Sequence, residues 1–147
     1  MKNKEEINRS LAITLLRSRE AVMDRFRPML ASAKITEQQW RVLRGLSEHG
    51  EVEAGKLAYI ACILPQSLSR ITKSFEKKNL ISMKNHPTDA RKILLSLTDD
   101  GKILMSRATI DSKEIYSQLI DDFGKENLDQ SLEKLDLLQS SLNLKSR

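Results

Sequence analysis

The sequence predicts a mainly α-helical protein that carries one small β-hairpin. Aromatic residues make up only 4% of the 147 residues and charged residues 31%, and Leu and Ile are the main apolar types. This composition is typical of helical proteins and not of a β-sandwich. Apolar residues recur at helical spacing along most of the chain, whereas residues 80–84 and 93–97 read as short strands. A chain of this length accommodates one domain with a sizeable core.

A long first helix is predicted from about residue 5 to residue 30, because this stretch contains no Gly and no Pro before Pro28. A helical turn of about 100° per residue gives it one apolar face, and Arg19 falls inside that face. A guanidinium that faces packed surface needs an acidic partner, a path to solvent or an anionic ligand. The face consists of Leu11, Leu15, Val22, Phe26 and Met29, widened by Ala12, Leu16, Met23 and Leu30.

A second helix is predicted from Thr36 to about Gly50. Thr36 and Gln39 form a capping-box pattern, and glycine often supplies the left-handed residue that ends a helix. Trp40, the single tryptophan, lies in this helix. A lone Trp at helical spacing is more typical of a core residue than of a ligand platform.

Two shorter helices follow, with a tight turn between them. The third is predicted over residues 52–60, and the fourth begins at Pro65, where the missing N–H of proline does no harm. Helix, short turn and helix form the helix-turn-helix arrangement. Cys62 lies in the turn, at residues 61–63, and is expected to be a small buried apolar residue.

The fourth helix is expected to present a polar outer face. Leu68, Ile71 and Phe75 are spaced to pack on the third helix. Among the side chains that then face outward, Gln, Ser and Arg can read base edges and Lys can neutralise phosphates. These outward residues are Gln66, Ser67, Ser69, Arg70 and Lys73.

A hairpin is predicted directly after this helix. Asn79 suits the left-handed cap, and residues 80–84 and 93–97 form two strands joined by turn-forming residues. A hairpin in this place makes a winged helix-turn-helix. Arg91, near its tip, can enter a DNA minor groove, where narrowing concentrates negative potential.

The charge pattern favours an anionic partner for this part of the chain. Residues 64–92 contain seven Lys or Arg and two acidic residues, a local net charge of +5. Residues 1–97 contain 18 basic and 10 acidic residues, whereas residues 98–147 contain 7 and 10. A duplex offers a dense row of phosphates to such a patch. The same excess of basic residues is also typical of an ordinary solvated surface.

The C-terminal third predicts two further helices, over residues 99–121 and 125–142, separated by Phe123 and Gly124. The last helix has Leu at 128, 132, 135, 138 and 142, close to a 3-4 spacing. These helices and the first one have more apolar surface than a small domain covers. We therefore expect an intertwined homodimer through the N- and C-terminal helices, with two recognition helices about 34 Å apart.

The expected organisation is a single domain in three parts. Residues 1–34 form a dimerisation helix together with residues 122–147, residues 35–98 form the winged DNA-binding lobe, and residues 99–147 form the long linking helix and the C-terminal dimerisation helix.

Several classes of protein are not favoured. One cysteine and no apolar leader predict a cytoplasmic protein, and no apolar run reaches the roughly 18 residues that span a bilayer. His49, His86 and Cys62 have no metal-ligand spacing. No nucleophile, base and orienting group are spaced to act together, and no glycine-rich phosphate loop occurs. We expect neither an enzyme, nor a metal site, nor a cofactor.

The order of these segments resembles the MarR family of winged helix-turn-helix regulators over essentially the whole chain. Its more specific part is Asp89-Ala90-Arg91 in the wing, followed by Leu97-Thr98-Asp99-Asp100-Gly101. Residues 15–30, 35–44 and 61–71 further resemble the regulators of homoprotocatechuate (4-hydroxyphenylacetate) degradation.

The resemblance implies a homodimeric repressor that binds a pseudo-palindromic operator in double-stranded DNA and leaves it when a small phenolic carboxylate binds. Such an effector binds between the dimerisation helices and the DNA-binding lobe. Carried over by position, the outward residues of the fourth helix contact the major groove. Asp89 braces the wing, and Arg91 reaches the minor groove.

For the effector, the resemblance makes Arg19 the first candidate to bind the carboxylate. Arg17 and Arg41 are further candidates, and Trp40 is a candidate ring contact. One departure is Leu64, where many relatives have Ser or Thr before the helix proline, so capping falls to Ser67 or to water. Two alternatives remain, namely a regulator of another phenolic-acid pathway and a winged-helix DNA-binding protein without a sensor.

Overall fold

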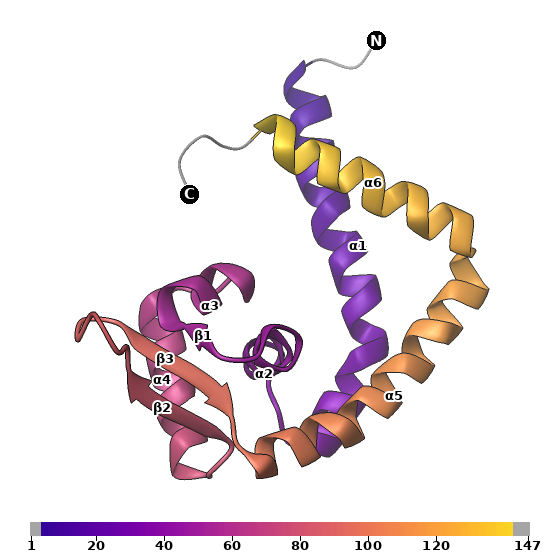
Figure 1. Ribbon diagram of the computed structural model, residues 1–147. Helices are drawn as coiled ribbons and strands as arrows, with labels where there is room; N and C mark the ends of the chain where they lie inside the picture. The colour runs from indigo at the N-terminus through magenta and orange to yellow at the C-terminus, as the bar shows by residue number, and fades with distance from the viewer. Residues whose placement is uncertain (1–3, 143–147) are drawn as a thin grey trace. The chain divides into compact units, whose positions relative to one another are not determined.

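The structure, a computed structural model, describes the backbone of residues 4–142 and the side chains of residues 10–142. It divides into two compact units, residues 1–110 and residues 111–147, with the boundary inside one long helix. The helices and strands in chain order are α1 (Lys4–Ala33), α2 (Glu37–His49), β1 (Val52–Glu53), α3 (Ala54–Ile60), α4 (Pro65–Lys77), β2 (Ile81–Asn85), β3 (Ile93–Leu97), α5 (Asp99–Phe123) and α6 (Lys125–Leu142) (Figure 1).

The predicted class, mainly helical with a small wing, is confirmed. Within residues 4–142, six helices accompany a three-stranded antiparallel sheet in the order β1-β3-β2. Met83 of β2 and Val52 of β1 both pair with Leu95 of β3, which is therefore the central strand. The core of the first unit lies between α2, α3, α4 and this sheet, where Leu43, Leu57 and Phe75 are almost fully buried.

Local signals placed most helix ends correctly. Thr36 caps α2, since its Oγ1 accepts the backbone N–H of Gln39 at 3.1 Å. The capping box is completed by the backbone N–H of Thr36, which donates to Gln39 Oε1 at 3.0 Å. Gly50 ends α2 with φ of 71°, and Pro65 occupies the first turn of α4. Asn79 has φ of 57°, as expected of a left-handed cap.

The third helix was predicted to begin at Val52, and this is wrong. Val52 and Glu53 form strand β1, and α3 starts only at Ala54. The physical reason is pairing with a distant segment, because Val52 aligns with Leu95 and is 4% exposed. A β-branched side chain fits this pleated, covered position well. The hairpin is therefore part of a three-stranded sheet.

Cys62 was expected to be buried, and this is also wrong. The residue has φ of 52° in the turn between α3 and α4, and its side chain is exposed. Its neighbours Ala61 and Ile63 are 2% and 8% exposed. A left-handed residue between two inward-facing neighbours turns its own side chain to the outside.

The first helix buries its apolar face only near its C-terminal end. Phe26, Met29 and Leu30 are buried, whereas Leu11 is 45% exposed and Val22 is 40% exposed. The helix passes through Pro28 and ends at Ala33, a few residues later than predicted, where Lys34 takes a left-handed conformation. Within the described chain, an apolar strip of α1 is therefore left uncovered.

The second unit, described to residue 142, consists of the end of α5 and of α6. Gly124, with φ of 95°, makes the break between the two helices at the predicted place. No described residue of α6 is buried, and Leu132, Leu135 and Leu142 are among its exposed apolar side chains. No helix among the described residues is long and apolar enough to cross a membrane.

A compact junction joins α4, the hairpin and the start of α5. Thr98 Oγ1 donates to Asn79 O at 2.6 Å and accepts the Gly101 amide at 3.1 Å. The Thr98 amide donates to Leu80 O at 3.1 Å. Because Gly101 has no side chain, the first turn of α5 lies directly against the Leu80 carbonyl.

Candidate nucleic-acid interface and effector pocket

Helix α4 has one apolar face and one polar face, as predicted. Leu68, Thr72 and Phe75 are 2–3% exposed and pack inward. Of the five predicted contact residues, four are exposed and one, Ser67, is half-buried; the exposed ones are Gln66, Ser69, Arg70 and Lys73. In the described part of the chain no ion pair involves Arg70 or Lys73, so both charges are available to a ligand.

The N-terminus of α4 has no side-chain cap. Leu64 occupies the N-cap position in an extended conformation, and its side chain is 71% exposed. The first amide groups of a helix lack partners inside the helix, and they attract anions. This end of α4 therefore adds partial positive charge to the polar face.

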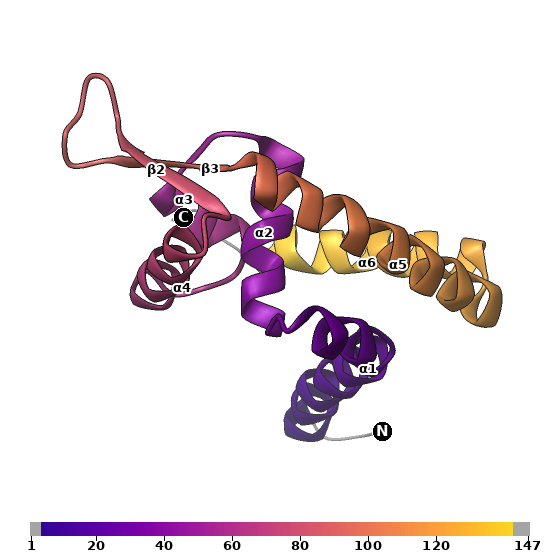
Figure 2. The same ribbon diagram turned by 90° about the horizontal axis from the view of Figure 1, so that it is seen from below.

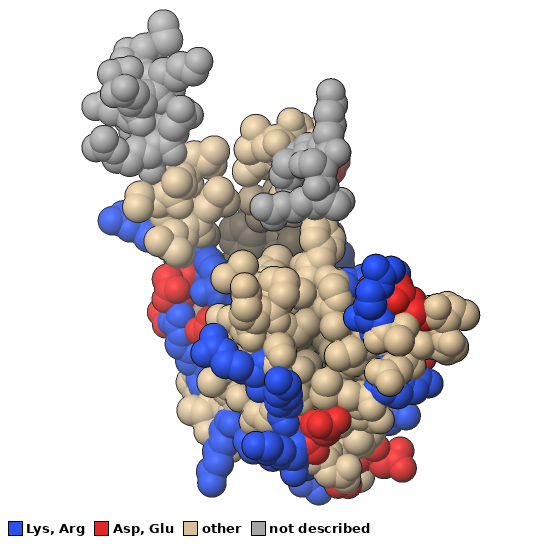
Figure 3. Space-filling view, turned by 90° about the vertical axis from the view of Figure 1, so that its left-hand side faces the viewer, with Lys and Arg blue, Asp and Glu red and all other residues tan. Residues whose placement is uncertain are grey.

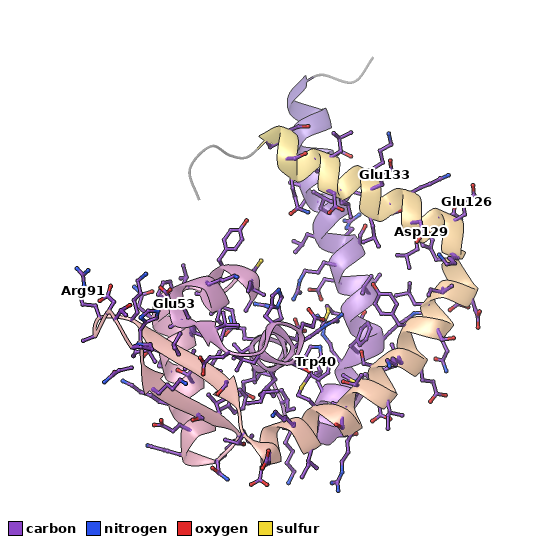
Figure 4. The ribbon with its side chains drawn as sticks, in the orientation of Figure 1. Trp40, Glu53, Arg91, Glu126, Asp129 and Glu133 are labelled. Carbon is purple, nitrogen blue, oxygen red and sulfur yellow. The ribbon has the colours of Figure 1, made fainter. Side chains whose placement is uncertain are left out.

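The wing loop between β2 and β3 projects beyond the helices of its unit (Figure 2). It is closed by backbone hydrogen bonds from His86 N to Lys92 O and from Lys92 N to Asp89 O, both 3.0 Å. Arg91 lies at the tip, and its side chain is 91% exposed (Figure 4). The wing thus presents a guanidinium on a loop of fixed shape.

Asp89 braces this loop. Its Oδ1 accepts hydrogen bonds from the Arg91 amide at 3.1 Å and from Arg91 Nε at 3.2 Å. The Arg91 side chain, followed by the Arg91 amide, holds the pKa of the Asp89 carboxyl below its usual value. The carboxylate is therefore ionised at neutral pH and keeps Arg91 at the tip.

Two lysines of the wing are paired with acids from the β1 segment. Lys84 Nζ lies 2.9 Å from Glu51 Oε2, and Lys92 Nζ lies 3.6 Å from Glu53 Oε2. The net charge of +5 counted for residues 64–92 overstates the unpaired charge of this region, because both acids lie outside that range. Figure 3 shows Lys and Arg side chains spread over the face that carries the wing.

A shallow, open hollow of about 630 Å³ lies beside α1 and α2. Two of the four predicted effector residues, Arg19 and Arg41, line it. Arg17 is exposed elsewhere on α1, and Trp40 of α2 (Figure 4) is buried in the core at 6% exposure. Neither residue lines the hollow. The complete lining is Arg19, Met23, Glu37, Gln38, Arg41 and Cys62.

The two arginines of the hollow have different partners. Arg19 Nη2 donates to Glu37 Oε2 at 2.8 Å, and Arg27 Nε donates to Glu37 Oε1 at 3.0 Å. These two cations, Arg19 first, hold the pKa of the Glu37 carboxyl below its usual value. Arg41 instead donates from Nε to the backbone oxygen of Ala61, at 2.8 Å. Three options were predicted for Arg19, namely an acidic partner, a path to solvent or an anionic ligand. The structure contains the acidic partner, Glu37.

Sequence reasoning missed Glu37 and Cys62 in the hollow. Glu37 was visible only as an acid in the first turn of α2. The need of Arg19 for an acidic partner was a signal for such a residue, but it could not say which one.

Comparison with known proteins agrees with this architecture. The MarR family model matches residues 35–93. The homoprotocatechuate degradative operon repressor of Escherichia coli is 40% identical over 121 residues, 82% of each chain. FarR, an HTH-type transcriptional regulator of Neisseria gonorrhoeae, is 36% identical over 137 residues, 91% of this chain and 94% of FarR. The structure of NadR in complex with 4-hydroxyphenylacetate is 36% identical with a TM-score of 0.80, over 88% of this chain and 92% of NadR.

A helix-turn-helix followed by a β-hairpin defines a winged helix-turn-helix protein. The extent and identity of these matches show that the chain belongs to the MarR family. Its relatives are named as transcriptional regulators and repressors, so it is a regulator and not an enzyme, which confirms the sequence prediction.

Proposed function

We propose that the protein is a homodimeric repressor of an aromatic-acid catabolic operon, and that a small phenolic carboxylate releases it from its operator. Homoprotocatechuate and 4-hydroxyphenylacetate are the effectors proposed. Support comes from the 40% identity to a homoprotocatechuate operon repressor and the 36% identity to NadR, which binds 4-hydroxyphenylacetate. A regulator of chromosomal genes acts where the DNA is, so we expect it in the cytoplasm.

The observation that supports DNA binding is the presence of two suitable surface elements, helix α4 and the wing. One element offers exposed Gln66, Ser69 and Arg70 on a helix of the size that enters a major groove. The other offers Arg91 on a braced loop, suited to an adjacent minor groove. Phosphate contacts fall to Lys73 and to the free amides at the start of α4.

Dimer formation is supported by the apolar side chains that the described chain leaves exposed. Leu11 and Leu15 of α1 are 45% and 38% exposed, and Leu132 and Leu142 of α6 are 46% and 72% exposed. A second copy would cover such strips through a two-fold interface. Two copies of α4 would then lie about one DNA turn, about 34 Å, apart.

Arg91→Ala is expected to weaken binding to operator DNA about 5- to 30-fold at moderate salt, while the dimer stays intact. The loss of one guanidinium from a narrow groove corresponds to about 1–2 kcal/mol, within the range for a specific base or groove contact. Fluorescence anisotropy with a duplex selected in vitro by the wild-type protein measures the affinity, and sedimentation measures the dimer.

Arg107→Ala is the matched control, because it removes the same charge from the exposed surface of α5. Its affinity for the duplex should stay within about twofold of wild type, since isolated surface charges contribute little. An Arg91→Ala protein that binds as tightly as wild type would exclude the wing from the interface.

Homoprotocatechuate and 4-hydroxyphenylacetate are expected to raise the melting temperature of the protein and to release it from the selected duplex. A ligand that binds the folded state stabilises it, by about 2.7 kcal/mol at 100 times its Kd. Thermal melts and the same anisotropy assay measure both effects. The control is tyramine, which keeps the 4-hydroxyphenyl ring of 4-hydroxyphenylacetate and has an aminomethyl group in place of the carboxylate. DNA affinity that is indifferent to both acids would favour the alternative, a winged-helix DNA-binding protein without a sensor.

A further inference from the structure

Arg41 belongs to both the hollow and the helix-turn-helix. It lies on α2, which stands between α1 and the helix-turn-helix (Figure 1). Its half-buried side chain lines the hollow with Arg19 and Cys62, and its Nε donates to the backbone oxygen of Ala61 at 2.8 Å. One guanidinium therefore contacts the hollow and the turn before α4.

The turn that Arg41 holds sets the position at which α4 begins. Ala61 is the C-cap residue of α3, and its amide donates to Leu57 O at 2.9 Å. Cys62 follows with φ of 52°, and the N-cap residue of α4, Leu64, makes no side-chain cap bond. A turn with a left-handed non-glycine residue and no cap on the next helix depends on its surroundings to keep its shape.

The partners of the two arginines decide which of them a carboxylate can recruit. Arg19 is already paired with the ionised Glu37 at 2.8 Å. Arg41 donates to a neutral carbonyl. A carboxylate offers a guanidinium two parallel bonds between full charges, whereas the carbonyl offers one bond to a neutral acceptor. A carboxylate in the hollow therefore competes more easily with Ala61 for Arg41 than with Glu37 for Arg19.

We infer that Arg41 is the positioning residue that couples effector binding to DNA release: a carboxylate in the hollow draws the Arg41 guanidinium from the Ala61 carbonyl and so loosens the turn that orients α4. This inference rests on the proposed function. It makes Arg41, rather than Arg19, the principal partner of the carboxylate. It also explains how a ligand beside α2 changes the affinity of a helix that it does not touch.

The test measures the coupling ratio, which is the Kd for the selected duplex with saturating 4-hydroxyphenylacetate divided by the Kd without it. For wild type we expect a ratio of at least about fivefold, a typical allosteric coupling. Arg41→Gln should bring the ratio close to one. Arg41→Lys keeps the positive charge but loses the planar guanidinium that makes two parallel bonds. Its coupling ratio should therefore lie between one and the wild-type value. Arg107→Gln, which removes an exposed arginine of α5 that does not line the hollow, should leave the ratio unchanged.

Hydrogen exchange gives a readout that a merely structural role of Arg41 would not move. In wild type, 4-hydroxyphenylacetate should increase amide exchange at residues 61–68 about threefold or more, because the turn loses its side-chain contact. In Arg41→Gln the same peptide should exchange at one rate with and without the ligand. Thermal melts of both Arg41 variants verify that they fold. If Arg41→Gln does not fold, Arg41→Lys takes its place in both measurements.

The outcomes separate the inference from the proposed function. A wild-type coupling ratio of one for both acids overturns the proposed effector and this inference with it. A wild-type response together with an undiminished ratio in both Arg41 variants overturns the inference alone. An undiminished ratio in Arg41→Gln with a lost ratio in Arg19→Gln would assign the coupling to Arg19 instead.

Discussion

Replacing Gly101 with alanine is expected to lower the free energy of unfolding by about 3 kcal/mol or more, a loss typical of severe overpacking at a buried position. A Cβ at this position would lie 2.2 Å from Leu80 O, and 3.2 Å from both the Leu80 carbonyl carbon and Leu97 Cδ2. The Leu80 backbone cannot move aside cheaply. Its amide donates to Phe75 O at 2.9 Å, and its oxygen accepts the Thr98 amide at 3.1 Å.

The measurement is urea unfolding followed by circular dichroism, at one protein concentration because dimer formation also stabilises the fold. Gly55→Ala is the matched control, since its Cβ would find only Glu53 Oε1 at 3.9 Å. At this exposed position of α3, alanine should leave stability unchanged or raise it by up to about 1 kcal/mol. A loss below about 1 kcal/mol for Gly101→Ala would mean that α5 can shift away from the hairpin, in contrast to overpacking of a fixed backbone.

The parts of the fold that were predicted correctly depend on local chemistry. Thr36 and Gln39 satisfy amide groups within one turn of each other, and Pro65 has the φ of a helix start before any other contact forms. The two faces of α4 follow from helical spacing, which needs no knowledge of the partner. These signals act within about four residues, so the sequence alone contains them.

The errors arose where a distant segment decides the structure. Val52 became part of a strand because Leu95, more than forty positions away, offers it a paired and covered place. Glu51 and Glu53 pair with wing lysines for the same reason. Cys62 faces outward because of a backbone angle that neither its polarity nor its neighbours' residue types indicate. Pairing across the chain and single dihedral angles cannot be derived from local spacing.

The candidate site was predictable to a similar extent. The predicted contact residues of α4 and the wing follow from periodicity and from the family resemblance. In the structure they are exposed, apart from Ser67 and Asp89, which are half-buried. The hollow was not predictable in detail, since its lining comes from α1, α2 and the turn after α3. Arg19 was recognised as a charge in need of a partner, but only the structure could assign that partner to Glu37.

Arg70→Ala is expected to reduce affinity for the selected duplex about 10- to 100-fold and to relax its sequence preference. Arg70 is exposed on α4, one turn beyond Gln66, and within the described chain it has no ion-pair partner. Its guanidinium is therefore free to make a bidentate contact with a guanine, worth about 1–3 kcal/mol of discrimination. Anisotropy titrations against the selected duplex and against a random duplex measure both quantities.

Lys73→Ala provides the contrast that separates base reading from charge. A lysine that only neutralises a phosphate should weaken binding to both duplexes by a similar factor and reduce the slope of log K against log salt by about one. Arg70→Ala should instead weaken the selected duplex much more than the random one, because the random sequence never supplied its base contact. Equal losses on both duplexes for Arg70→Ala would reduce Arg70 to a phosphate contact and leave Gln66 and Ser69 as the base-reading residues of α4.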